Sequence, residues 1–582
     1  MSHLIRPRNL SINVGTVKNA QQSTAIELSD ADLAAHMALY GGTGKGKSKL
    51  LELVLRQIID QHRGACIIDP HGDLVEDLLA YIMRRPDALE SKLLSRVHYF
   101  DPGSPKHRFS FDPFRYQPLP DGDHDYDDWL KAKVESTAKL IIRKQGEADF
   151  QGRPRLEQYL TAILYCVGTR LNAKGDHLPL CDAHIFLDKR HPRHVELMTK
   201  VARLIPQHIL SDLEEVLALS LERRREMLGS TIGRLRSFFT PVVSSLFTNE
   251  AKTTVDFRKI VEQQGIVLVN LRRTRSFSID QGNAIGGMFI NEILEAAETA
   301  DRRKRLPFFL FIDEASRFVG QDLLDALGQF RKWKLSLCLA VQDLSALKTK
   351  EIDMVGKVMS QCDIQVCFQQ KYPDDVETFG RFFGVPSLDF TPLLHEVDRP
   401  DGYFPVDTEQ RGHSTAKRSS NSSQESSGYS EDRNRTLTGY TDNKSRGRGS
   451  DTTDTDTLSL GTQYLSKTRV DIQETGKLRA AVMDQIYRKM HDITKLGRGE
   501  AMVFAGNSTP FTLKVHRVQS PFSSISSDEV ADILEKYKAR ICVNHSYSYK
   551  KSKLPNAGQM HIGQTDFPNE PDKPPDNPSP FH

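Results

Sequence analysis

The stretch His36–Ser48, HMALYGGTGKGKS, decides the fold of this chain. It opens with the apolar run His36–Tyr40, which is typical of a buried strand, and the apolar-periodic stretch Lys49–Ile59 behind it predicts a helix. Eight residues join the two elements and fit the pattern G-x-x-x-x-G-K-[ST] in full. They are Gly41, Gly42, Thr43, Gly44, Lys45, Gly46, Lys47 and Ser48.

The spacing of these eight residues has a physical reason. Glycines let backbone N–H groups wrap phosphate oxygens, Lys47 can reach the terminal phosphates, and Ser48 can offer its hydroxyl to Mg²⁺. An ordinary glycine-rich turn is the alternative. The position between a strand and a helix favours a phosphate loop that uses ATP and Mg²⁺.

Further strands predict the fold class. Ala65–Asp69 follows Gly64, which gives a strand, helix, strand unit with a parallel sheet. Apolar runs return at 265–271, 308–312, 335–341 and 363–368, with helical spacing between them. We therefore expect an α/β protein with a RecA-like core, a mainly parallel doubly wound sheet, an all-helical insertion and a disordered Ser-rich insert.

Composition along the chain suggests the domain organisation. Helical spacing dominates 126–250, and 408–467 is rich in Ser, Thr, Asp, Asn, Arg and Gly, which leaves little apolar surface to offset ordering entropy. The expected units are a lead-in over 1–35, the first part of the core over 36–125, the helical insertion over 126–250, the second part of the core over 251–407, the disordered insert over 408–467, a closing segment of the core over 468–518, and a helix with a disordered tail over 519–582.

Two carboxylates complete the predicted site. The apolar strand 308–312 ends in Asp313 and Glu314, so Asp313 can hold the metal with Ser48, and Glu314 can act as the general base on water. Gln342 ends the next strand, where it could contact the γ-phosphate or the attacking water, and a plain strand-end glutamine is the alternative. Asp69, in DPHGD, lies beside the loop, although a turn built by Pro and Gly explains that motif equally well.

Charge, cysteines and hydropathy limit the partners and the location. A formal net charge of +3 and a pI near 8.3 neither demand nor forbid nucleic acid. The seven cysteines include no C-x-x-C pair, which argues for a reduced, cytoplasmic chain without a zinc site or disulfide framework. No apolar run approaches the ~20 residues of a spanning helix, so we expect no intrinsic membrane span.

In this order, the motifs HMALYGGTGKGKS, CIIDPHGDL, IVLVNL, FFLFIDEASRF and LCLAVQDL resemble the HerA/FtsK superfamily, particularly its HerA-like and TraD/TraG-type ATPases. The resemblance runs from about Glu27 to Pro392 and resumes over Gly497–Arg517. It implies a hexameric ring that hydrolyses ATP at subunit interfaces and drives DNA through a central channel. It also implies an arginine finger at Arg331, with Arg381 in reserve, and a surface arginine in a basic loop is the alternative for Arg331.

The N-terminal region of this chain differs from that of both groups. TraD/TraG-type proteins carry N-terminal transmembrane helices and full HerA proteins carry a small β-barrel, whereas only about forty residues precede the loop here. We therefore expect a motor that is soluble or docked on partner proteins.

The expected function is translocation of DNA, single- or double-stranded, in conjugative transfer, DNA processing or defence. Candidate DNA-facing residues are Arg223, Arg224, Arg225, Arg234 and Arg236, and protein partners could bind the insert 408–467. An ATP-driven protein remodeller shares every nucleotide-site residue. A nucleotide-switched scaffold without turnover is the third possibility, although such a switch would have no need of Glu314.

Overall fold

The fold is described from a computed structural model. The described residues are 10–18, 23–85, 93–104, 106, 109–116, 125–142, 154–172, 175–247, 255–303, 305–349, 352–384, 403–414, 423–431, 437–446, 455–466, 483–506, 508–522 and 525–542.

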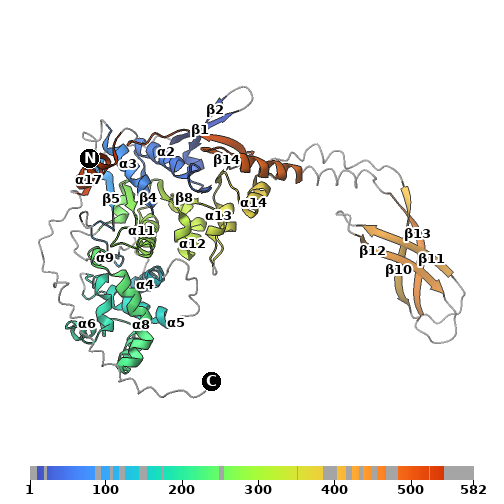
Figure 1. Cartoon of the computed structure of the whole chain (residues 1–582). Helices are drawn as coiled ribbons and strands as arrows, with labels where there is room; N and C mark the ends of the chain where they lie inside the picture. Colours follow the sequence, from blue (N-terminus) through green and yellow to red (C-terminus); the bar gives the residue numbers. More distant parts are fainter. Residues whose placement is uncertain are drawn as a thin grey trace, which may run out of the picture.

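An eleven-stranded sheet forms the centre of the molecule (Figure 1), with strand order β2-β1-β15-β14-β9-β3-β8-β7-β4-β6-β5. From β9 to β5 all neighbouring strands are parallel, and β14 joins β9 antiparallel. The strands are β1 Ser11–Lys18, β2 Ser23–Ser29, β3 Met37–Tyr40, β4 Gly64–Asp69, β5 Val97–Phe100, β6 Ile266–Asn270, β7 Phe308–Ile312, β8 Leu335–Val341, β9 Ile364–Phe368, β14 Glu500–Ala505 and β15 Phe511–Val515.

Helices cover both faces of this sheet, which explains why its central strands are apolar at successive positions. Along β4, Cys66 and Ile68 belong to one core cluster, whereas Ala65 and Ile67 belong to the other. The first cluster includes α11 and the helical insertion, and the second includes α2 and α3. The predicted doubly wound, mainly parallel α/β core is therefore confirmed.

The helices in chain order are α1 Asp30–Leu33, α2 Lys47–Asp60, α3 Asp73–Met83, α4 Tyr126–Ile142, α5 Pro154–Gly168, α6 His194–Val201, α7 Gln207–Ala218, α8 Leu221–Phe238, α9 Pro241–Ser244, α10 Phe257–Glu262, α11 Ile279–Thr299, α12 Gln321–Gln329, α13 Val355–Gln361, α14 Pro373–Gly384 and α17 Ser527–Cys542, with a further helix over 483–495. In the sequence, helices α4 to α9 come after β5 and before β6, and in space they lie together on one side of the core (Figure 1). None of the described helices is long and apolar enough to cross a bilayer.

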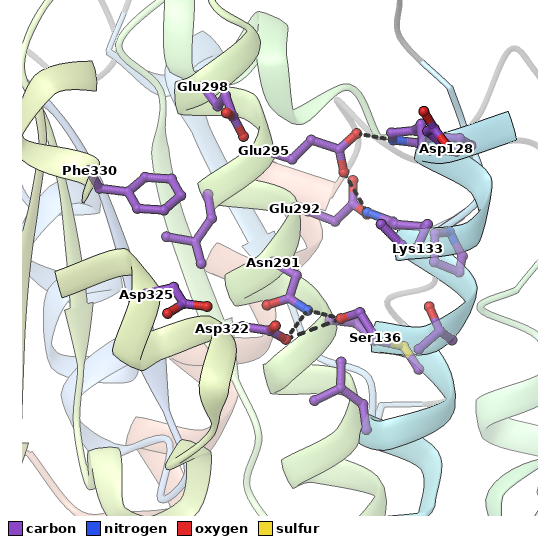
Figure 2. A pocket seen from close by; sticks show the side chains of 17 residues that line it. Asp128, Lys133, Ser136, Asn291, Glu292, Glu295, Glu298, Asp322, Asp325 and Phe330 are labelled. Carbon is purple, nitrogen blue, oxygen red and sulfur yellow. Dashed lines mark hydrogen bonds and ion pairs between the residues drawn. The ribbon is translucent and has the colours of Figure 1, made fainter. Parts of the chain in front are cut away.

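The helical insertion meets the core along a polar seam between α4 and α11. Lys133 of α4 forms ion pairs with Glu292 and Glu295 of α11, and the Trp129 indole N–H donates to Glu295 Oε1 at 2.7 Å. These side chains, together with Asp322 of α12, line a cavity of about 440 Å³ (Figure 2). Burial and the neighbouring Glu295 raise the pKa of Glu292 to about 7, although Lys133 opposes the shift.

The N-terminal segment differs from the expected lead-in. Strands β1 and β2 pair as an antiparallel hairpin, and β1 pairs with β15 at the edge of the central sheet. Ile12, Val14 and Leu28 are buried in the core, because alternate residues of the hairpin point inward. The description of 1–35 as a lead-in is therefore wrong for residues 11–18 and 23–29, which extend the sheet.

The segment 408–467 also differs from its prediction. Strands β10 Tyr403–Ser414, β11 Ser423–Glu431, β12 Leu437–Arg446 and β13 Thr455–Ser466 form a separate sheet in the order β10-β13-β11-β12. The prediction of disorder is wrong over these strands. Threonine and tyrosine favour strands even where aliphatic residues are few, and β10 and β13 pair along their whole length. The predicted disordered tail beyond 542 lies outside the described residues.

Candidate active site

The loop Gly41–Ser48 lies at the C-terminal edge of the parallel strands, between the end of β3 and the start of α2. The backbone of Gly46 has φ +129°, a region that side chains rarely adopt, and a Cβ there would lie 2.9 Å from Phe368 Cε1. Phe368 ends β9 and packs against the loop at Gly41 and Gly46. At Gly42 and Gly44 an added Cβ would meet nothing within 4 Å, so open space borders the loop at these two positions.

Lys47 and Ser48 begin α2 and point back into the site. The Lys47 ammonium donates to the carbonyl oxygens of Gly41 and Gly42, at 3.3 Å in the case of Gly42. Burial lowers the pKa of Lys47, and the charge of Asp313 acts in the opposite direction. The Ser48 hydroxyl donates to Asp313 Oδ2 at 3.2 Å, so the predicted pair of metal ligands lies together.

Asp313 follows β7 and is 8% exposed. Burial, followed by the nearby charge of Asp69, raises the pKa of Asp313 to about 6. The two carboxylates lie close because β4 and β7 are neighbours with Ile68 opposite Ile312. A buried pair of acids beside a hydroxyl is a favourable environment for a divalent cation, since the cation offsets the charge repulsion.

The carboxylate of Asp69 has a structural task as well. It accepts the backbone N–H groups of His71 at 2.8 Å and Val75 at 3.1 Å, which closes the turn into α3. The turn interpretation of DPHGD is therefore correct, and Asp69 also contributes charge to the site.

Glu314 adopts a left-handed backbone conformation with φ +55°, which is uncommon for a residue with a side chain. Its carboxylate has three neighbours. Gln342 Nε2 donates to Oε1 at 3.2 Å, while His71 Nε2 lies 2.9 Å and Arg317 Nε 2.7 Å from Oε2. Gln342 thus joins Glu314 as a member of the site. The contact of His71 was missed from the sequence because more than two hundred residues separate it from Glu314, whereas Arg317 is only three residues away and its spacing could have indicated the contact.

The two candidate arginine fingers lie outside this cluster. Arg331 precedes β8, at the opposite edge of the sheet from the phosphate loop; its side chain is 62% exposed and lies 3.5 Å from Asp363. Arg381 lies in α14, where it pairs with Glu377 at 2.6 Å. Neither side chain joins the loop of its own chain, so a role for either in catalysis requires the site of a neighbouring copy.

The closing segment contacts the loop directly. The Gly499 N–H, in the turn before β14, donates to the Lys45 carbonyl at 3.0 Å, and the Lys45 ammonium donates to Gln369 Oε1. Residues more than 450 positions away in the sequence thus support the phosphate loop.

The arginines of α8 that were predicted to face DNA differ in their exposure. Arg234 is 8% exposed and donates to the Ile142 carbonyl, so it has a structural role, whereas Arg223 and Arg236 are exposed.

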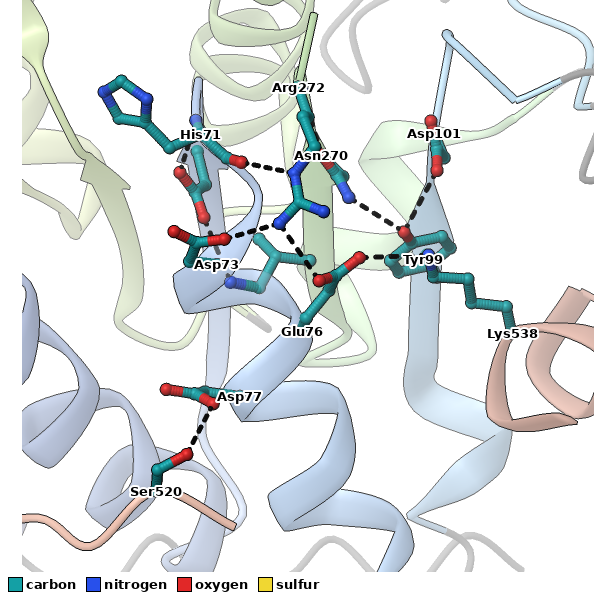
Figure 3. A network of polar contacts seen from close by, with 12 residues as sticks. His71, Asp73, Glu76, Asp77, Tyr99, Asp101, Asn270, Arg272, Ser520 and Lys538 are labelled. Carbon is teal, nitrogen blue, oxygen red and sulfur yellow. Dashed lines mark hydrogen bonds and ion pairs between the residues drawn. The ribbon is translucent and has the colours of Figure 1, made fainter. Parts of the chain in front are cut away.

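These residues fit a nucleotide phosphate with its cation. The Lys47 ammonium, the Ser48–Asp313 pair and the Glu314 carboxylate lie around the loop, and these are groups of the kind that phosphoryl transfer to water uses. Figure 3 shows the polar network behind the site, in which His71 and Arg272 take part.

Residues 12–139 match the family model of the HerA helicase central domain. The expected resemblance to the HerA/FtsK superfamily is confirmed over these residues, which include the phosphate loop. No curated protein matches the chain.

Several solved structures share a likeness at low identity. The bacterial conjugative coupling protein TrwBdeltaN70 is 14% identical, covers 87% of this chain and 90% of its own, and has a TM-score of 0.49. The plasmid coupling protein TrwB in complex with ADP and Mg²⁺ is 13% identical, with 88% and 95% covered and a TM-score of 0.49. VirB4 of Thermoanaerobacter pseudethanolicus is 13% identical, with 87% and 96% covered and a TM-score of 0.44. The fold assignment rests on the strand order and the loop geometry rather than on these likenesses.

Proposed function

We propose that this chain is an ATP-hydrolysing motor that moves DNA as a ring of identical subunits, a hexamer of the HerA and TraD kind. The observation that carries the proposal is the hydroxyl of Ser48 at 3.2 Å from Asp313, with Glu314 next in the chain, at the mouth of a complete phosphate loop. The match of residues 12–139 to the HerA central domain supports the DNA-moving class.

The roles of the residues follow from their chemistry. The Lys47 ammonium offsets charge on the terminal phosphates, and Ser48 with Asp313 holds Mg²⁺, which supplies electrophilic stabilisation of the phosphoryl oxygens. Glu314 accepts a proton from the attacking water, and Gln342, hydrogen-bonded to Glu314, helps to fix the position of that water.

Arg331 is the proposed arginine finger, and its place at the far edge of its own sheet is compatible only with action on a neighbouring copy. The Arg331 guanidinium is exposed and lies 3.5 Å from Asp363, an ion pair that is too weak to fix the position of the side chain. This arrangement favours a ring, since each subunit would complete the site of the next.

Steady-state ATP hydrolysis tests this proposal. The chain and its Lys47→Ala variant are measured without nucleic acid, with single-stranded DNA and with duplex DNA. Stimulation by DNA that is absent from the variant supports the motor and identifies the strand form. Turnover that is indifferent to DNA favours the protein remodeller, and absence of turnover in both chains contradicts the proposal.

The proposed biological setting rests on the resemblance to the HerA/FtsK superfamily. Conjugative transfer with a type IV secretion channel, DNA processing and defence all use motors of this kind, and the second sheet, β10 to β13, is a candidate surface for protein partners.

A further inference from the structure

His71 connects the catalytic carboxylate to a polar network that the reaction itself does not use. Its Nε2 lies 2.9 Å from Glu314 Oε2, although the ring is 57% exposed and forms no part of the phosphate loop. The backbone on both sides of the ring is fixed. Asp69 accepts the His71 N–H at 2.8 Å, and the Arg272 guanidinium donates to the His71 carbonyl at 2.7 Å.

Arg272 follows β6 and joins the His71 turn to α3. Its guanidinium forms ion pairs with Asp73 and Glu76, the latter at 3.1 Å. Figure 3 shows Arg272 between these two carboxylates and the backbone of His71. The side chain of Glu76 is 13% exposed, so this contact is better shielded from solvent than an ordinary surface ion pair.

The C-terminal helix supplies the next link. Lys538 of α17 lies with its ammonium 3.1 Å from Glu76 Oε1 and 5.6 Å from the ring centre of Tyr99, and its side chain is 11% exposed. Helix α17 contacts α3 and β5. A continuous chain of polar contacts therefore runs from α17, through Glu76 and Arg272, to His71 and Glu314.

We infer that His71 is a positioning residue for Glu314, and that Lys538 of α17 sets its position through Glu76 and Arg272. The inference rests on the proposed hydrolysis of ATP. Glu314 needs support because its backbone is in the left-handed region and its side chain rotates about three bonds. Gln342 donates a hydrogen bond to Oε1, whereas His71 Nε2 and Arg317 Nε lie within ion-pair distance of Oε2 without the geometry of a hydrogen bond. Loss of one of these contacts should let the Glu314 carboxylate adopt more orientations, without changing the groups that bind phosphate.

His71→Ala tests the first link, with His208→Ala, an exposed histidine of α7, as the matched control. We expect kcat to fall about 10- to 100-fold, while the Kd for a fluorescent ATP analogue stays within twofold and the melting temperature is unchanged. His71→Gln should recover part of kcat, since its amide N–H can donate to Glu314. A kcat for His71→Ala equal to that of His208→Ala would overturn the inference.

Lys538→Met tests the second link, and Lys536→Met, an exposed position on the same helix, is its control. Hydrogen exchange of residues 69–76 supplies a readout that does not depend on activity. We expect faster exchange and a lower kcat in Lys538→Met, but not in Lys536→Met. The effects of His71→Ala and Lys538→Met on kcat should combine to less than their product, because both act through one contact chain.

These experiments separate the inference from the proposed function. Wild-type turnover that Lys47→Ala abolishes, together with unchanged kcat in His71→Ala, overturns the inference alone. Absence of wild-type turnover contradicts the proposed function, and the inference falls with it. Exchange at 69–76 that is the same in Lys538→Met and in the wild type removes α17 from the chain of contacts.

Discussion

Replacing Lys133 with methionine should strongly weaken the junction between the helical insertion and the core. The ammonium of Lys133 is the shared partner of Glu292 and Glu295, and all three side chains are at most one quarter exposed. The variant would leave two neighbouring carboxylates without their cation. Breaking a buried ion pair from one side costs about 3–5 kcal/mol, which we expect here at pH 8.

The loss of unfolding free energy in Lys133→Met should be larger at high pH than at low pH. The pKa of Glu292 in the folded chain is about 7, above its ordinary 4.5, so the folded state binds more protons than the unfolded state between these values. This group therefore favours folding at low pH, and its contribution is lost as pH rises from about 4.5 to 7. Without Lys133 the pKa of Glu292 should rise further, so the deficit of the variant should be smaller at pH 5 than at pH 8.

Urea unfolding followed by tryptophan fluorescence measures this deficit. Trp129 donates to Glu295 and reports on the seam, and Trp333→Phe removes the other tryptophan of the chain. Lys131→Met, an exposed position of α4, is the matched control, and adding Glu292→Gln to Lys133→Met should restore part of the loss. A deficit below about 0.5 kcal/mol, or one that is equal at pH 5 and pH 8, would refute the reasoning.

Three further predictions concern the site. Lys47→Ala should lower ATP turnover at least about 100-fold, because the ammonium that offsets phosphate charge is lost, and phosphate release with a melting curve checks both activity and folding. Arg331→Ala should lower kcat about 1,000-fold or more with nucleotide Kd within twofold; normal turnover would show that the finger assignment is wrong. Gly46→Ala should cost about 1–3 kcal/mol in folding or nucleotide affinity because of φ +129° and the close Phe368. Gly229→Ala, in the interior of α8 with no atom within 4 Å of the added Cβ, should not destabilise the fold or weaken nucleotide binding in the same calorimetric and binding measurements.

The parts of the fold that the sequence predicted correctly are those with local causes. The phosphate loop is specified by eight consecutive residues, and the position of Asp313 follows from the apolar strand that ends beside it. Parallel strands bring their C-terminal ends to one edge, so the meeting of Ser48 with Asp313 could be expected from the order of strands and helices alone.

The contacts of His71 and Arg234 that were missed are non-local. Nothing near His71 in the sequence indicates that its ring meets Glu314, because the contact depends on β4 and β7 being neighbours in the sheet. The burial of Arg234 against the Ile142 carbonyl likewise depends on how α8 packs on α4, and an arginine in a basic stretch gives no sign of it.

Strand pairing between residues far apart in the sequence explains why two predictions about the fold were wrong. The hairpin β1–β2 is completed by β15, about five hundred residues later, so residues 11–29 look unremarkable until Val515 is placed beside Gly15. The Ser- and Thr-rich segment lacks the aliphatic residues that usually mark a strand, and pairing such as Tyr403 with Ser466 supplies the backbone hydrogen bonds instead.

Displacement of streptavidin from biotinylated DNA tests most directly whether the chain is a DNA motor. Single-stranded and duplex substrates, labelled at either end, are incubated with the protein and ATP, beside Lys47→Ala and a non-hydrolysable ATP analogue. A motor releases streptavidin from one strand form only with hydrolysable ATP and only in the wild type. Hydrolysis of ATP without release from any substrate would contradict the proposal that the energy of the site is used to move DNA.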